Sequence, residues 1–105
     1  MAKEAITRKK AIQILERKGW LVWHGPKVKY KQTDIFGTFD LICWKKRVGE
    51  LKFIQLTTLP NLSTRRKKIK NFLKKNKINT KILPAVEIEL WAWNKNNKKF
   101  KVELI

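Results

Sequence analysis

Two stretches of the chain place their apolar residues at helical spacing. Residues 3–18 run up to Gly19, a natural stop for a helix, and residues 62–75 begin beside Asn61 and Ser63, either of which can cap the first turn. The apolar side chains of each stretch line one face of a helix. They are Ala5, Ile12 and Leu15 in the first stretch and Leu62, Ile69, Phe72 and Leu73 in the second. The pattern predicts two amphipathic helices.

Short apolar runs between and after these helices predict strands. The clearest is 85–93, where Val86, Ile88, Leu90 and Ala92 alternate with Glu87, Glu89, Trp91 and Trp93. Residues 27–33 are basic and half-extended, as a loop or an edge strand would be. The expected strands are 20–23, 38–44, 51–57, 85–93 and 100–104.

The predicted elements follow the order α-β-β-β-α-β-β. A chain of 105 residues is the size of one domain, so residues 1–105 are expected to fold as a unit. The fold class is α/β, or α+β by some conventions. We expect a mixed central sheet of about five strands flanked by the helices.

The strands 38–44 and 51–57 are predicted to form an antiparallel hairpin. Pairing Lys45 with Glu50 across the turn brings Asp40 opposite Gln55. Thr38 then faces Thr57 on the same side of the sheet, and the opposite side holds Phe39, Leu41, Cys43, Ile54 and Leu56. A shift of one residue in register would undo this arrangement.

The same register separates the motif Glu50-Leu-Lys52 from Asp40. Glu50 lies beside the turn, roughly 17 Å along the hairpin from the level of Asp40 at ~3.3 Å per residue. We therefore expect Glu50 and Lys52 to belong to a solvated hairpin end and not to a site with Asp40.

Charge narrows the class of partner. The chain has 26 Lys and Arg residues against 8 Asp and Glu residues, a formal net charge of +18. Repulsion on this scale opposes folding unless a polyanion relieves it, and phosphate contacts release counterions. We expect DNA as the partner rather than RNA; an acidic membrane surface and non-specific anion binding are weaker alternatives.

Cys43 is the only cysteine, so no disulfide or cysteine-based zinc site forms within the chain. It lies in an apolar strand, and a buried free thiol suits a reducing compartment. No apolar run reaches the length of a membrane span, and no signal peptide is visible. These features predict a cytoplasmic protein.

The segment Phe39-Asp-Leu-Ile42, a turn, Phe53-Ile-Gln-Leu-Thr57 and a basic helix together resemble the PD-(D/E)XK nuclease superfamily. Within it, the small archaeal Holliday junction resolvases are most similar, in size, leading helix and hairpin. The resemblance covers roughly the whole chain by pattern rather than identity, and the same string is also similar to uncharacterised nuclease-like proteins of phages and mobile elements. It implies a restriction-endonuclease-like fold, Mg²⁺ or Mn²⁺ as cofactor, and a homodimer by analogy.

The resemblance also implies roles for individual residues. Asp40 matches the metal-binding Asp, Gln55 stands where a metal-binding Glu is expected, and Thr57 stands where a Lys would help to activate water. Arg8 occupies the place of the Glu that resolvases carry on the leading helix, with Glu4 one turn earlier. The Gln carbonyl is a hard oxygen that Mg²⁺ accepts, but it supplies no charge. The expected catalytic residues are thus Asp40, Gln55 and Thr57, with Asp40 and Gln55 holding the metal.

Cations crowd the second predicted helix. Arg65, Arg66 and Lys68 lie in its first turns, where the helix macrodipole disfavours positive charge, so a bound phosphate would offset a local cost. Lys29 and Lys31 form a second candidate strip; a simple exposed basic edge is equally consistent with them. The five tryptophans lie in predicted strands, which favours core packing over base stacking for most of them.

Two functions follow as expectations. The first is a Mg²⁺-dependent endonuclease acting on DNA, including branched or Holliday junction DNA. The alternative is a catalytically inactive module of the same fold that binds nucleic acid without cutting it. An RNA-binding or host-modulating protein of a mobile element is a third possibility, for which only the charge speaks.

Overall fold

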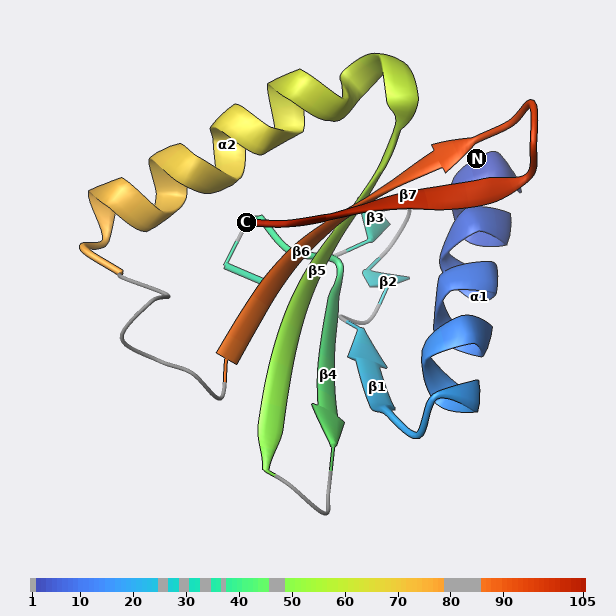
Figure 1. Cartoon of the computed structure of the whole chain (residues 1–105), viewed down its shortest axis with the longest axis horizontal. Helices are drawn as coiled ribbons and strands as arrows, with labels where there is room; N and C mark the ends of the chain where they lie inside the picture. The colour runs from blue at the N-terminus through green and yellow to red at the C-terminus, as the bar shows by residue number, and fades with distance from the viewer. Residues whose placement is uncertain are drawn as a thin grey trace.

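The computed structural model describes residues 2–24, 27–28, 31–32, 35–36, 38–45, 49–78 and 86–105. For residues 2–5, 27–28 and 31–32 the description covers the backbone alone. Two helices flank a five-stranded mixed sheet, as the sequence predicted (Figure 1). The elements are α1 (Ala2–Arg17), β1 (Leu21–His24), β2 (Lys27–Val28), β3 (Lys31–Gln32), β4 (Leu41–Lys45), β5 (Glu50–Thr58), the short 3₁₀ helix η1 (Leu59–Asn61), α2 (Leu62–Lys75), β6 (Val86–Asn94) and β7 (Lys99–Leu104).

The strands of the main sheet lie in the order β1-β4-β5-β6-β7. Strands β5 and β6 are parallel, which requires a crossover, and α2 lies on that crossover. The remaining neighbours are antiparallel. Strands β2 and β3 pair separately as a small ribbon within the stretch expected to be a loop or an edge strand. Among the described helices, none is long and apolar enough to cross a membrane.

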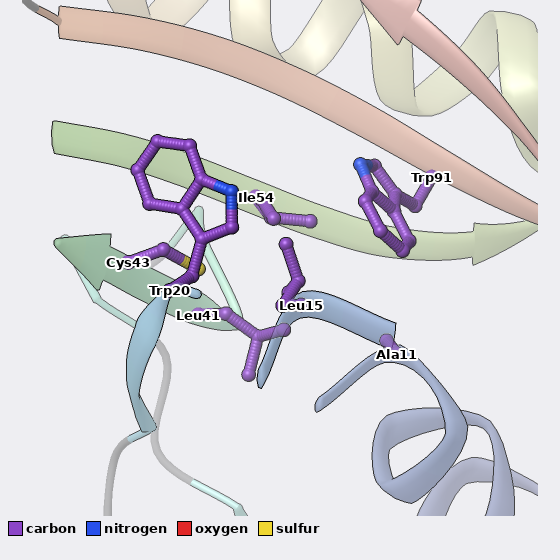
Figure 2. Close-up of a cluster of buried hydrophobic side chains, with 7 residues drawn as sticks. All are labelled: Ala11, Leu15, Trp20, Leu41, Cys43, Ile54 and Trp91. Carbon is purple, nitrogen blue, oxygen red and sulfur yellow. The ribbon is translucent and has the colours of Figure 1, made fainter. Parts of the chain in front are cut away.

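Helix α1 covers one face of the sheet. Leu15 of α1 is 1% exposed and packs with Leu41 and Cys43 of β4 and Ile54 of β5 (Figure 2). Trp20, at the end of the α1–β1 connection, and Trp91 of β6 close the two ends of this cluster. The stripe predicted for residues 3–18 is therefore the face that fixes α1 to the sheet.

Helix α2 covers the opposite face. Its Ile69 is fully buried against Ile88, Leu90 and Ala92 of β6, with Phe39 from the segment before β4. The alternation predicted for residues 85–93 is confirmed, because the even-numbered residues meet α2 and Trp91 meets the α1 side. The sheet is thus buried on both faces where the two helices lie.

The predicted hairpin register is confirmed from Lys45–Glu50 to Leu41–Ile54. The motif Glu50-Leu-Lys52 is indeed separate from Asp40. The expected solvated hairpin end is wrong for Lys52, because its side chain is 12% exposed and its Nζ atom lies 3.2 Å from Glu89 and 3.9 Å from Glu87, both on β6. The loop length was therefore sufficient to fix the pairing over these residues.

The expectation that most tryptophans pack in the core was too broad. Trp20 and Trp91 are buried, and Trp93 is half-buried. Trp23 and Trp44 are 54% and 45% exposed. They lie on the sheet face opposite α1, on the edge strand β1 and its neighbour β4, whereas α2 packs over β5 and β6.

Cys43 is a buried free thiol in β4. Burial raises its pKa from 9.0 to about 12; the charge of Lys52 lowers the value and that of Glu89 raises it. Because the folded pKa lies above the unfolded one, the protonated thiol contributes its full stability below pH 9.0, and that contribution is lost as the pH rises toward about 12.

We predict that Cys43 is inert toward a thiol reagent such as DTNB in the native protein. At pH 8 its thiolate fraction should be on the order of 1,000-fold lower than in the unfolded chain, since about three pH units separate the two pKa values. Stopped-flow labelling in buffer and in denaturant measures this directly, because no other cysteine contributes. Fast labelling of the native protein would show that β4 is accessible.

Candidate functional site

Asp40 lies at a break in the β4–β5 ladder. Its backbone N–H donates to the carbonyl of Ile54 at 2.9 Å, although Ile54 already pairs with Leu41. Two residues of one strand therefore face one residue of the other, which is the arrangement of a β-bulge. A bulge interrupts the alternation of side chains, so residues before it change face.

The bulge separates Phe39 from Leu41. Leu41 packs in the cluster under α1, whereas Phe39 packs in the cluster under α2. The prediction that both lie on one face was wrong, because uninterrupted alternation does not hold across Asp40. Asp40 instead turns its side chain toward α1.

The two oxygens of the Asp40 carboxylate contact different elements. Its Oδ2 atom accepts the backbone N–H of Leu56 at 2.7 Å, at a point where β5 has passed the end of β4. Its Oδ1 atom lies 3.7 Å from the guanidinium of Arg8 on α1. Both side chains of this ion pair are 16% exposed. Asp40 therefore ties the first turns of α1 to the central strand.

Gln55 lies on the other side of the sheet. Its neighbours in β5, Ile54 and Leu56, both pack under α1, so regular alternation points Gln55 toward α2. The residue is 4% exposed, and its Oε1 atom accepts no hydrogen bond from the described residues. The expectation that Asp40 faces Gln55 is thus wrong, and its physical cause is the bulge.

A pocket of about 640 Å³ opens at the carboxyl ends of β5 and β6. Asp40 and Thr57 line it, and so do three cations: Arg8 of α1, Arg65 of α2 and Lys95 of the β6–β7 turn. Gln55 is not among the described side chains that line it. Its other lining residues are Ile6, Thr7, Leu56, Thr58, Leu59, Pro60, Asn61, Trp93, Asn94 and Asn96. We call it the strand-end pocket.

The described side chains of this pocket do not fit a Mg²⁺ ion. Such an ion needs several hard oxygens in octahedral geometry. Asp40 supplies the pocket's one carboxylate among the described residues, and a guanidinium already lies beside it. The described residues contain no cluster of three His, Cys, Asp or Glu side chains. Thr57 lies in the pocket, but Gln55 does not join it there.

The cations predicted to bind phosphate lie in different environments. Arg66 makes a two-bond ion pair with Glu103 of β7, at 2.8 and 2.7 Å, and this pair raises the pKa of Arg66 and lowers that of Glu103. Arg65 lines the strand-end pocket and Lys68 is half-buried on α2. Lys29 lies outside the described residues, and of Lys31 only the backbone, in β3, is described.

The exposed face of α2 carries cations that the sequence analysis did not select. Lys67, Lys70 and Lys74 are exposed and recur at helical spacing, on the side of α2 away from the buried Ile69. We call them the α2 lysine stripe. The buried stripe of α2, already visible in the sequence, would have identified them as its complement.

Comparison of the chain with protein-family models, with curated proteins and with solved structures finds no match.

Gln55 offers a test of the site geometry. Gln55→Leu removes a buried carbonyl that lacks a hydrogen-bond partner among the described residues. The free energy of unfolding of this variant should therefore stay within about 1 kcal/mol of wild type. Gln55→Glu should lose about 3 kcal/mol or more at pH 7, because it buries a carboxylate among apolar side chains. The loss should shrink as the pH falls and the carboxyl group becomes protonated.

Urea denaturation at pH 7 and pH 5 measures both variants. A Gln55→Glu protein as stable as wild type at pH 7, with a thermal shift in Mg²⁺ that wild type lacks, would place this side chain beside Asp40 in the strand-end pocket.

Proposed function

We propose that this chain binds the phosphate backbone of DNA and does so without a metal ion. The observation that carries the proposal is the α2 lysine stripe: three exposed ammonium groups on one helix face, in a chain of net charge +18. Helix α2 contains no acidic residue. Arg66 of this helix forms an ion pair with Glu103 of β7, but Arg66 is not part of the stripe.

The geometry of the stripe suits a row of phosphates. Lys67 and Lys74 are one heptad apart, which spans about 10.5 Å at ~1.5 Å per residue. Lysine side chains are flexible point charges, so they track a backbone without demanding one base sequence. This arrangement supports binding that depends strongly on salt and weakly on sequence.

The strand-end pocket extends this basic surface around the end of the sheet. It lies at the start of α2, where η1 runs directly into the helix and the backbone N–H of Leu62 already donates to the carbonyl of Leu59. Asn61, the residue before α2, makes no capping bond with its side chain and donates instead to Thr58 at 3.2 Å. Arg8, Arg65 and Lys95 add positive charge there. A phosphate group is the ligand best matched to these donors.

The endonuclease implied by the resemblance remains the second candidate. In its favour, Asp40 and Thr57 line one pocket at the carboxyl ends of parallel strands, where ligands of open α/β sheets commonly bind. Against it, Arg8 stands beside Asp40 where a cation would be needed, and Gln55 faces the other way. The geometry therefore favours binding over cutting.

We predict that Lys70→Gln/Lys74→Gln weakens duplex DNA binding and flattens its salt dependence. Losing two phosphate contacts should change the slope of log K against log [salt] by about 1.8, at ~0.9 per contact. Fluorescence anisotropy with a labelled duplex, titrated across salt concentrations, measures the slope.

The matched control is Lys9→Gln/Arg17→Gln, which removes the same charge from exposed positions of α1. Its slope should stay near that of wild type. Equal slopes for the two double variants would contradict an interface on α2 and indicate diffuse attraction by the net charge.

A further inference from the structure

A groove of about 420 Å³ runs along the α1 side of the sheet, between α1 and the edge strand β7. Its floor is aromatic: Trp91 and Trp93 of β6 and Phe100 of β7 all line it. The ring of Phe100 lies 5.2 Å from that of Trp91 and 4.9 Å from that of Trp93, between centroids. Trp91 is buried, whereas Trp93 and Phe100 are half-buried and open to the groove.

The rim of the groove is basic. Lys10 and Lys18 of α1 stand on one side, and Lys98 and Lys99 at the β6–β7 turn stand on the other. The carboxylate that lines the groove, Glu89, is already engaged by Lys52 at 3.2 Å and by the Nε1–H of Trp91 at 2.9 Å. The four rim lysines form no salt bridge with the described residues, so a ligand meets a net positive rim.

Trp93 connects this groove to the strand-end pocket, because it lines both. The two hollows therefore adjoin at Trp93, which stands between the cations Arg8 and Lys95 of one and the aromatic floor of the other. In Figure 1 the turn between β6 and β7 reaches the first turns of α1, and residues of both line the strand-end pocket.

We propose that the groove binds one unpaired nucleotide, with its base on Trp93 and Phe100 and its phosphate between the rim lysines. A flat π surface beside cations is the recurring arrangement for unpaired bases, and it tolerates any base. The inference rests on the proposed DNA binding and names its substrate class: DNA with an unpaired segment next to a phosphate backbone.

Lys10 changes its partner when a nucleotide enters the groove. Its ammonium group lies 4.6 Å from the centre of the Trp93 ring. A base that stacks on Trp93 displaces this ammonium, which is then free to pair with the phosphate of the same nucleotide. Stacking of a base contributes more than a cation–π contact at an exposed site, so the exchange favours binding.

The test measures Trp93→Leu with two probes of equal length, a single-stranded oligothymidylate and a duplex. The variant should bind the single strand roughly 10-fold more weakly than wild type. Its affinity for the duplex should fall clearly less than its affinity for the single strand, since duplex bases are not free to stack. Trp23→Leu is the matched control, because Trp23 is 54% exposed and lines neither hollow.

A second variant controls for misfolding of the Trp93→Leu protein. Lys10→Gln/Lys99→Gln alters the rim and leaves the aromatic floor, and it should weaken the single strand more than the duplex. Equal loss of both probes, or no loss of either, in Trp93→Leu would overturn the proposal. A Trp23→Leu variant that loses the single strand as strongly would overturn it as well.

Thymidine monophosphate distinguishes the source of the nucleotide. If it quenches tryptophan fluorescence in wild type but not in Trp93→Leu, and competes with the oligothymidylate, the groove takes a free nucleotide as well as one within a strand. Such quenching in a wild-type protein that does not bind the oligothymidylate would refute the strand as ligand. The proposed DNA interface on α2 is tested separately. An unchanged slope of log K against log [salt] for duplex binding in Lys70→Gln/Lys74→Gln would refute that interface and not the groove.

Discussion

The contact between the Asp40 carboxylate and the backbone N–H of Leu56, 2.7 Å long, organises the end of the sheet where the pockets meet. It satisfies a donor of the central strand at the point where its neighbour β4 has ended. A hydrogen bond to a charged acceptor is stronger than a neutral one. The bulge that makes it possible turns Asp40 to the α1 side and leaves Phe39 to pack under α2. Asp40 thereby links β5 to α1, at the point where the chain passes from the cluster under α2 to the cluster under α1.

This arrangement gives Asp40 a structural role. Arg8 supplies a positive charge 3.7 Å from the carboxylate, and Gln55 is buried on the other face. Positive charge in the strand-end pocket then exceeds negative charge, since Arg65 and Lys95 are also present. On our proposal, a surface of this kind attracts phosphate instead of concentrating a divalent cation. The same charge continues along α2 on one side and around the α1–β7 groove on the other.

Local patterns were sufficient to predict the helices, the five-stranded sheet and the register from Lys45–Glu50 to Leu41–Ile54. The bulge could not be predicted, because the sequence around Asp40 alternates as an unbroken strand would. The pairing of Arg66 was equally hidden, since its partner Glu103 lies 37 residues away in a different element. The exposed tryptophans show a further limit: the sequence does not tell which strands a helix covers, and Trp23 of β1 and Trp44 of β4 remain exposed because α2 packs over β5 and β6.

The most direct test of the central claim compares DNA binding and DNA integrity in EDTA and in Mg²⁺ or Mn²⁺, with linear, nicked and four-way DNA. Binding without a metal predicts equal affinity in EDTA and in Mg²⁺, with every substrate intact. Cleavage that requires the metal and disappears in Asp40→Ala would contradict the account. It would show that Arg8 yields its place to a metal ion when DNA is bound.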